Sequence, residues 1–562
     1  MQPLRLGPDG YFHQPDGQRV VLVGANYWPA GSGVAMWQDW PADQIQHDLD
    51  LLIAHGLNSL RFFLLWPDVH PEPDTFTPAV LDRLDQLLGW CTQRCIYTQP
   101  TLFTGFMSGG LFWPAWKAGR SLYEPGPMRV QSVRFARAIA QRLAPHASAI
   151  ACIDLGNELV CLPDSAQSAP KDVADWCAEV CLAIRLAWPD AQIISGNEQN
   201  QIVADRGWRL GQQPGTDLYS MHGYPVPAWH PVPFDGMADP LARELLPLYT
   251  RAARAFGPVM LQEFGTILCF DPARIAAYLE AILPACWEAG ANGFLWWCLR
   301  DIHAHTHPYR KVGMEQSLGL LDHVGRVKPG LEVFTRFAQS VQNAPAPPAV
   351  SERELSIYWP DHYYAKDAPQ NPGNQPESLS RRIIAANHML VRQGRLPGIA
   401  RRRGEPPGSV IHDHVRMLWV PGAWLDQLEA HALAQWVHSG GRLVLHGIGP
   451  YSFGPAMIDL TAATPQDFRH ARPVKARFAS TDWTLHAHPA QVRLQVQLHH
   501  KATCLATDED GLPVVWTARI GTGRVVAVAP QVDEQVAQLA GEPARRAAWD
   551  AWYHAILQHL LA

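Results

Sequence analysis

The sequence predicts an α/β protein with a (β/α)8 TIM barrel, then a small open α/β domain of flavodoxin-like type, then a β-rich C-terminal segment. Over roughly the first 320 residues, eight apolar runs of strand length are followed by helical patterns, as in such a barrel. These runs are apolar without alternation, which is typical of parallel strands covered on both faces. A Pro- and Ala-rich stretch at 343–350 then separates the barrel, 1–342, from the rest.

Composition indicates a large globular protein. The chain has 562 residues, of which 47% are hydrophobic and 17% charged, so we expect more than one domain and a large core. The net charge of −6 is not concentrated in any block, which argues against nucleic acid or an anionic membrane as a partner. The aromatic rings of the 22 Trp and 14 Tyr residues have flat faces, and a small neutral sugar can stack on such a face.

No segment indicates export or membrane insertion. The first residues lack the basic start and apolar core of a signal peptide, and no apolar run has membrane-spanning length. We therefore expect a cytoplasmic protein. Its ten cysteines are scattered, and we expect reduced core thiols rather than disulfides or metal ligands.

The first barrel units can be justified residue by residue. A hairpin over 11–23 turns at Gln14-Pro15-Asp16-Gly17, and its second arm continues as the first strand toward Asn26 and Trp28. From Asp43 the apolar residues recur with helical spacing until Gly56, and the second strand follows at 57–64. The later predicted strands are 95–102, 149–156, 191–196, 217–222, 259–263 and 293–298. The later predicted helices are 79–94, 130–143, 173–187, 241–255, 272–288 and 331–338.

The second half has a different pattern. Strand-like runs at 355–359, 415–421 and 442–447 with a helix at 424–438 predict the α/β domain at 351–454. The segment 455–562 begins with less regular sequence, for which we expect mixed strand and loop to about 505. It closes with a strand at 523–529 and a helix at 542–561. Gly521-Thr522-Gly523 precedes a strand, so it predicts a hairpin turn and not a phosphate loop.

Polar and aromatic residues stand where the predicted barrel strands end. Because the carboxyl ends of barrel strands converge on one pocket, we expect these side chains to lie together. They combine carboxylates, one arginine, an asparagine and aromatic rings, which suits a neutral sugar rather than a phosphate. The candidates are Asn26, Trp28, Arg61, Asn157, Glu158, Glu198, His222, Tyr224, Glu263 and Trp297.

Two of these carboxylates suit retaining glycoside hydrolysis, which needs an acid/base and a nucleophile about 5 Å apart. Strands four and seven lie on opposite sides of an eight-stranded barrel, so Glu158 is predicted as acid/base and Glu263 as nucleophile. We expect Arg61 to keep Glu263 ionised, and burial and the charge of Glu263 to raise the pKa of Glu158. The motif Gly-Asn-Glu recurs at strand five, where Glu198 is interpreted as a substrate-binding residue.

These residues together resemble clan A of the glycoside hydrolases, and the barrel resembles family 5. The matching motifs are Asn157-Glu158, His222-x-Tyr224, Leu261-Gln262-Glu263-Phe264-Gly265 and Trp296-Trp297, with Arg61. The resemblance implies that Asn157 binds the sugar 2-hydroxyl, Tyr224 contacts the nucleophile and Trp297 forms the floor beneath the ring. It also implies that no cofactor or metal is needed. A histidine common after strand three is missing from 101–106, so the contacts on that side of the pocket differ.

The layout of the second half is similar to family 42 β-galactosidases, whose middle domain serves trimerisation, and to some family 5 exo-β-mannosidases. This resemblance implies a trimer and an exo-β-mannosidase acting on short oligosaccharides such as mannose β-linked to N-acetylglucosamine. A β-galactosidase is the alternative, and a non-catalytic carbohydrate-binding barrel is a remote one.

Long loops predict a pocket and so an exo enzyme. One, at 106–129, carries Trp113 as a further substrate-binding candidate, and the other spans 300–316. The second contains His303, His305 and His307, which we interpret as a pocket wall or subunit contact because no carboxylate or cysteine ligand is clearly placed beside them.

Overall fold

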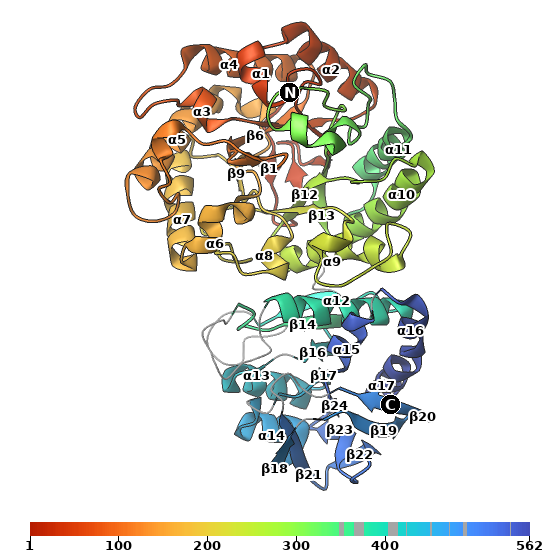
Figure 1. The fold of residues 1–562 in the computed structure, drawn as a ribbon. Coiled ribbons are helices and arrows are strands. Elements are labelled where there is room, and N and C mark those ends of the chain that lie inside the picture. Colours follow the sequence, from red (N-terminus) through yellow and green to blue (C-terminus); the bar gives the residue numbers. More distant parts are fainter. Residues whose placement is uncertain are drawn as a thin grey trace. The chain divides into compact units, whose positions relative to one another are not determined.

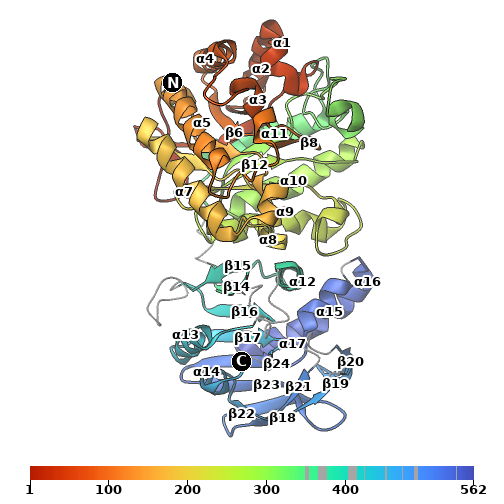
Figure 2. The same cartoon turned by 60° about the vertical axis from the view of Figure 1, so that its left-hand side comes forward.

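The computed structural model describes residues 1–347, 353–364, 376–402, 414–422, 424–449, 452–470, 472–486, 492–539 and 541–562. It divides into two compact units (Figures 1 and 2). Unit 1 comprises Met1–Pro225 and Ala252–Pro347, and unit 2 comprises Val226–Arg251 and Pro348–Ala562. Residues 348–350 of the predicted linker lie outside the described residues. The predicted domain boundaries stay predictions.

Eight parallel strands form the barrel of unit 1, as predicted. They pair in the order β10-β9-β6-β5-β4-β13-β12-β11, and a parallel bridge between Ile194 and Leu218 joins the two ends. Every strand is almost entirely buried, which explains why the runs are apolar without alternation. The strands are β4 (Leu22–Asn26), β5 (Ser59–Phe63), β6 (Tyr97–Phe103), β9 (Ile153–Gly156), β10 (Ile193–Ile194), β11 (Tyr219–Gly223), β12 (Val259–Phe264) and β13 (Ala291–Trp296).

Helices surround these strands (Figure 1). Most of them begin with a proline at the first helical position, where its missing N–H is not needed and its fixed φ suits the helix. They are α2 (Ala42–Ala54), α4 (Pro78–Gln93), α5 (Pro127–Leu143), α7 (Pro170–Ala187), α10 (Pro272–Glu288) and α11 (Pro329–Asn343). Helix α9 (Pro240–Arg254), also begun by a proline, belongs mostly to unit 2. The expectation of eight full strand-then-helix units is wrong at strand five, because only the short α8 (Asn200–Val203) follows it before a stretch with Gly207, Gly211 and Gly215.

The predicted N-terminal hairpin is confirmed. Strand β2 (Phe12–His13) pairs with β3 (Arg19–Val20), and β1 (Arg5–Leu6) adds a third strand. Phe12 and Val20 belong to one buried apolar cluster with Leu22, Tyr97 and Met260 from three barrel strands. The hairpin therefore covers the amino-terminal end of the barrel and leaves the carboxyl ends of the strands for the site.

Unit 2 contains one seven-stranded sheet, in the order β15-β14-β16-β17-β24-β23-β22 (Figure 2). Strands β15 (Gly398–Arg401), β14 (Leu355–Trp359), β16 (Met417–Pro421), β17 (Arg442–His446) and β24 (Gly523–Val528) are parallel, as in an open α/β fold. Strands β23 (Pro513–Ile520) and β22 (Ala502–Thr507) continue the sheet antiparallel. The predicted hairpin at Gly521-Thr522-Gly523 is confirmed between β23 and β24.

The remaining described elements of unit 2 are helices and two small antiparallel sheets, one of β18 and β21 and the other of β19 and β20. Helix α13 (Gln427–His438) begins at Asp426, which forms a capping box with Glu429. Helix α12 (Pro376–Arg392) was not predicted. The predicted terminal helix is confirmed as α16 (Pro543–Ala548) and α17 (Asp550–Leu561), after α15 (Val532–Gln538). The irregular segment starts with α14 (Pro455–Thr461) and continues as β18 (Ala463–His470), β19 (Val474–Phe478), β20 (Thr481–Leu485) and β21 (Val492–Leu498).

Within the described ranges, no helix has both the length and the apolar character needed to cross a membrane.

Candidate active site

Arg61 is the centre of the polar network at the carboxyl ends of the barrel strands. It lies on β5 beside Asn26 of β4, and its side chain is fully buried. The guanidinium donates to Glu263 Oε2 (3.1 Å) and Asn26 Oδ1 (3.0 Å) through Nη1, and to Asn157 Oδ1 (2.9 Å) through Nη2. Three strand ends are thereby held by one side chain, whose planar fork presents several donors.

A buried arginine needs compensating negative charge, and Asp154 supplies it from inside β9. Its Oδ2 accepts from Arg61 Nε (3.0 Å) and Nη2 (2.8 Å), and from the Thr101 hydroxyl (2.6 Å). Sequence reasoning did not single out Asp154. The available signal was a lone carboxylate in the apolar run Cys152-Ile153-Asp154-Leu155.

The predicted nucleophile Glu263 has donors on both oxygens. Tyr224 donates its phenol to Oε1 (2.7 Å), and Arg61 donates to Oε2. Burial nevertheless raises the pKa of Glu263 above its ordinary value, while the charge of Arg61 and the Tyr224 hydrogen bond oppose that rise. The expectation that Arg61 acts toward ionisation is met in direction, but burial has the larger effect.

The predicted acid/base Glu158 lies at the start of the 3-10 turn η4 (Leu159–Cys161), with φ of 48°. Burial raises its pKa to about 7, as predicted, and the charge of Arg61 opposes the rise, whereas the predicted contribution of the Glu263 charge is not found. Single oxygens of Glu158 and Glu263 and a ring nitrogen of His222 all lie within 4.8 Å of one another. Glu158, whose pKa is raised to about 7, thus lies near Glu263, whose two oxygens accept from Arg61 and Tyr224.

His222 links these two carboxyl groups. Burial lowers its pKa to about 4, so the ring is neutral at pH 7. The Gln262 amide donates to Gln99 (3.3 Å), which turns its oxygen toward His222 Nε2 (3.4 Å). With the ring proton on Nε2, Nδ1 accepts from the protonated carboxyl of Glu158, 3.2 Å away. This arrangement favours the acid form of Glu158.

Asn157 and Trp297 border the carboxyl pair. The amide of Asn157 donates to the Phe106 carbonyl (2.9 Å), which fixes its orientation, and its oxygen retains one lone pair beyond the Arg61 bond. The indole of Trp297 donates to Glu315 Oε2 (3.0 Å). Glu315 is a further buried carboxyl that sequence reasoning missed, and burial raises its pKa to about 7. It lies in the long loop after strand eight.

The contacts described for Trp28 and Trp113 are with residues other than Glu158 and Glu263. Trp28 is fully buried and stacks on Phe63, with ring centroids 5.4 Å apart, and Phe63 meets Trp297 edge-on at 5.8 Å. Trp113 is half-buried and carries Lys117 over its ring at 5.2 Å. Its ring passes so close to Gly105 that a Cβ there would meet it at 2.3 Å. Sugar contacts by Trp28, Asn26 and Trp113 stay predictions.

Glu198 has different partners from Glu158. Its Oε1 accepts from the backbone N–H of Asn200 (3.0 Å) and from the Cys161 thiol (3.4 Å). Burial and the neighbouring charge of Glu158 raise its pKa to about 8. Glu198 is therefore close to Glu158. The hydrogen bonds from Arg61 and Tyr224 described above go to Glu263 and not to Glu198.

Two sets of side chains in the described part of the chain have the spacing of metal ligands. In Glu158, His222 and Glu263, the Glu263 oxygens already accept from Tyr224 and Arg61, and a cation would meet the Arg61 charge. In His362, Asp426 and Glu429, the two carboxylates form the capping box of α13.

In the histidine-rich loop, His303 stacks on His323 with ring centroids 4.0 Å apart. Its proposed wall or contact role stays a prediction.

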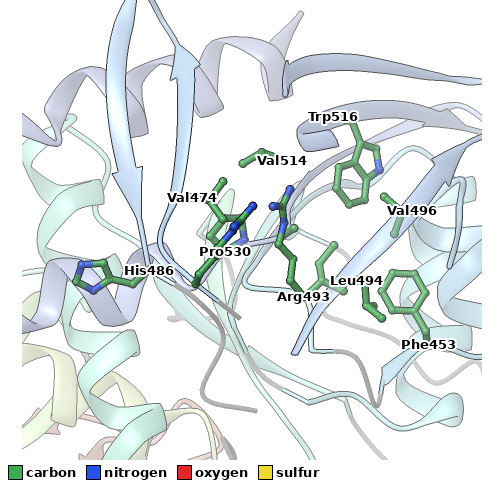
Figure 3. A pocket seen from close by; sticks show the side chains of 12 residues that line it. Phe453, Val474, His486, Arg493, Leu494, Val496, Val514, Trp516 and Pro530 are labelled. Carbon is green, nitrogen blue, oxygen red and sulfur yellow. The ribbon is translucent and has the colours of Figure 1, made fainter. Parts of the chain in front are cut away.

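Unit 2 has a separate cavity, which is lined mainly by apolar side chains (Figure 3). Its two arginines are already paired, Arg493 with Asp508 and Arg472 with Asp510. No carboxylate is among the described residues that line it. The predicted carboxyl pair, Glu158 and Glu263, lies in the barrel and not in this cavity.

Comparison with known proteins agrees with the site. No protein-family model and no curated protein matches the chain. Among solved structures, the exo-β-1,4-mannosidase from Opitutaceae bacterium strain TAV5 is 42% identical, with a TM-score of 0.93 over 98% of this chain and 99% of that chain. The chain belongs to glycoside hydrolase family 5. This hydrolase is a β-glycosidase, and the alternative of a non-catalytic barrel is set aside.

Two solved structures of more distant proteins share the fold of this family 5 hydrolase. A subfamily 18 enzyme from Streptomyces cattleya, in complex with Manβ1-4GlcNAc, is 21% identical with a TM-score of 0.60, over 68% of this chain and 94% of that chain. The β-galactosidase from Rahnella sp. R3 is 15% identical with a TM-score of 0.68, over 92% and 88%. The predicted resemblance to a family 5 barrel with a β-galactosidase-like layout is confirmed.

Proposed function

We propose that this hydrolase is a retaining exo-β-mannosidase that releases mannose from short oligosaccharides such as mannose β-linked to N-acetylglucosamine. The observation that carries the proposal is the carboxyl pair. Single oxygens of Glu158 and Glu263 lie within 4.8 Å of one another, below the separation of about 6.5–9.5 Å between the carboxyl groups of inverting enzymes, and this short separation favours a retaining mechanism.

In the first step, Glu263 attacks the anomeric carbon while the carboxyl of Glu158 gives its proton to the leaving oxygen. The glycosidic bond breaks, and a covalent ester forms between the sugar and Glu263. In the second step, the Glu158 carboxylate takes a proton from water, which attacks the anomeric carbon and releases the sugar with its configuration retained. Arg61 and Tyr224 stabilise the Glu263 carboxylate as it leaves, because they already donate to its two oxygens.

Mannose is proposed because of the relative and the placement of Asn157. The 42% identical relative is an exo-β-1,4-mannosidase, and the Streptomyces cattleya structure contains a β-mannosyl disaccharide. The free lone pair of Asn157 Oδ1 is suited to accept from the 2-hydroxyl, the position at which mannose differs from glucose. The β-galactosidase alternative is kept because the Rahnella enzyme shares the fold over most of the chain.

A substrate screen tests the sugar. Turnover of 4-nitrophenyl β-mannoside should exceed that of the β-galactoside and β-glucoside, and release of mannose from the disaccharide should follow. Preference for the galactoside would establish the alternative. Absence of turnover on every β-glycoside would overturn the proposal as a whole.

Azide chemistry tests the two carboxyl roles separately. Glu263→Ala should lose turnover, and added azide should attack from the vacated side to give the inverted glycosyl azide from an activated substrate. Glu158→Ala should instead give glycosyl azide of retained configuration, because the ester still forms on Glu263. Glu198→Ala is the matched control at the duplicate motif. If Glu198→Ala behaves as expected for Glu158→Ala, the acid assignment is wrong.

The assembly and location are proposed on the resemblance alone. We propose a cytoplasmic homotrimer built through the α/β domain. Light scattering should give three times the chain mass of 62.5 kDa, and a mass equal to one chain would refute the trimer.

A further inference from the structure

We infer that Asn197, in the second Gly-Asn-Glu motif, is a positioning residue for the acid/base: the motif at strand five holds the turn that presents Glu158. This inference rests on the proposed role of Glu158 as acid/base.

The central contact is a hydrogen bond between the second motif and the turn that follows the first. Asn197 Oδ1 accepts from the backbone N–H of Val160 at 3.0 Å. Val160 lies within η4, the turn that begins at Glu158, and an N–H in a first helical turn has no partner within the helix. The side chain of Asn197 satisfies this donor from a neighbouring strand, much as a capping residue does from within the chain.

Asn197 is itself held rigidly. It is fully buried, its amide nitrogen donates to the Ser195 carbonyl (3.3 Å), and its own carbonyl accepts from the Ser220 hydroxyl (2.7 Å). Its backbone N–H also contacts Ser220 Oγ. The acceptor offered to Val160 is therefore fixed by strands five and six and does not move with η4.

The residues on either side of Asn197 contact the same segment. Glu198 Oε1 accepts from the thiol of Cys161, the last residue of η4, at 3.4 Å. Gly196 has φ of 67°, and a Cβ at that position would lie 1.9 Å from the Gly156 carbonyl oxygen. The second motif thus packs on Gly156 and on η4, and Gly196 permits the close approach.

Glu158 needs such support because its backbone is in the left-handed region, with φ of 48°. Residues other than glycine adopt that region only where the surroundings hold them there. Within the turn, the Cys161 N–H donates to the Glu158 carbonyl (2.8 Å). If the Asn197 acceptor is removed, the Val160 N–H is buried without it, and η4 is expected to shift and carry the Glu158 carboxyl with it.

The nucleophile is held by other residues, which makes the inference testable. Glu263 is bound by Arg61 and Tyr224, neither of which contacts η4 through the bonds described above. Loss of Asn197 should therefore weaken proton donation and leave nucleophilic attack nearly intact. Proton donation matters for a sugar leaving group and hardly for 2,4-dinitrophenolate, which departs without protonation.

The test compares kcat/KM of Asn197→Ala on two substrates, since kcat/KM reports the first chemical step. We expect a loss of about 10- to 100-fold on mannosyl-N-acetylglucosamine and of less than about threefold on 2,4-dinitrophenyl β-mannoside. Equal losses on both substrates, or no loss on either, would overturn the inference, because a purely structural defect has no dependence on the leaving group.

Two further variants and one reference complete the design. Asn58→Ala is the matched control, since Asn58 makes the same kind of paired backbone contacts, with Val23 N–H (2.8 Å) and the Val21 carbonyl (3.0 Å). Asn58→Ala should change kcat/KM by the same factor on both substrates. If Asn197→Ala does not fold, Asn197→Ser keeps a polar group that is too short to reach Val160. Glu158→Ala must itself show the leaving-group dependence; if it does not, the proposed acid assignment fails, whereas a dependence in Glu158→Ala alone refutes only the role of Asn197.

Discussion

The Tyr224→Phe substitution should move the acid limb of the pH profile to higher pH. The phenol donates to Glu263 Oε1 at 2.7 Å, and this bond opposes the effect of burial on the carboxylate. With Glu263 as the proposed nucleophile, activity requires its ionised form and is lost as the pH falls through the pKa of Glu263. Removing the donor destabilises the carboxylate, raises its pKa further, and shifts the loss of activity upward.

The size of the shift follows from the strength of the bond. A hydrogen bond to a charged group contributes about 1.5–3 kcal/mol, and one pKa unit corresponds to about 1.4 kcal/mol. We therefore expect the acid limb to rise by about one to two units, with up to a 10- to 100-fold loss of kcat/KM at a pH below the new limb. The basic limb should stay in place because it belongs to Glu158, so the active range narrows from the acid side.

The assay is kcat/KM on 4-nitrophenyl β-mannoside from pH 4 to 9. Tyr27→Phe is the matched control, because its buried phenol donates to the Asp48 carboxylate at 2.9 Å, outside the Glu263 network. Its acid limb should be unchanged. An unmoved acid limb in Tyr224→Phe would refute the reasoning that this bond supports the ionised nucleophile.

Two further outcomes follow from the same groups. With the pKa of Glu158 raised to about 7, kcat/KM of the unmodified enzyme on the disaccharide should fall about tenfold per pH unit above that value; a flat profile to pH 9 would contradict the acid role. Glu198 has a pKa raised to about 8, so its contribution to stability is fully present below its unfolded pKa of about 4.3 and is lost as the pH rises through about 8. Glu198→Gln should consequently raise the melting temperature relative to the unmodified enzyme more at pH 8.5 than at pH 4.5, and equal differences at the two pH values would refute this.

The barrel was predictable because its strands are defined by local sequence. Each run is short and mostly apolar, all but the fifth are followed by a helix of several turns, and the ends of the runs are within a few residues of those observed. Helix α12 was missed for the opposite reason. Its buried face includes Arg382, Asn387 and His388, which read as a polar surface. They are buried because partners distant in sequence satisfy them, as Glu244 does for His388 (3.0 Å).

The same limit applies to the site. Residues such as Arg61 and Glu263 were found because the barrel rule places strand ends together, and the rule needs only their position in the strand. Asp154 was missed because it stands inside a strand, where an apolar run was expected. A carboxylate is needed at this position because the charge of Arg61 is buried, and Arg61 becomes buried only when the barrel is assembled.

The two Gly-Asn-Glu motifs show why titration alone does not assign an acid. Burial raises the pKa of Glu158 to about 7 and that of Glu198 to about 8, so either would hold a proton at neutral pH. What separates them is the direction in which each carboxyl is held. Glu158 faces His222, within 4.8 Å of a Glu263 oxygen, whereas Glu198 is bound to Asn200 and Cys161. In the proposed reaction, Glu158 is therefore the proton donor opposite Glu263, and Asn197 of the second motif is inferred to support the turn that carries Glu158.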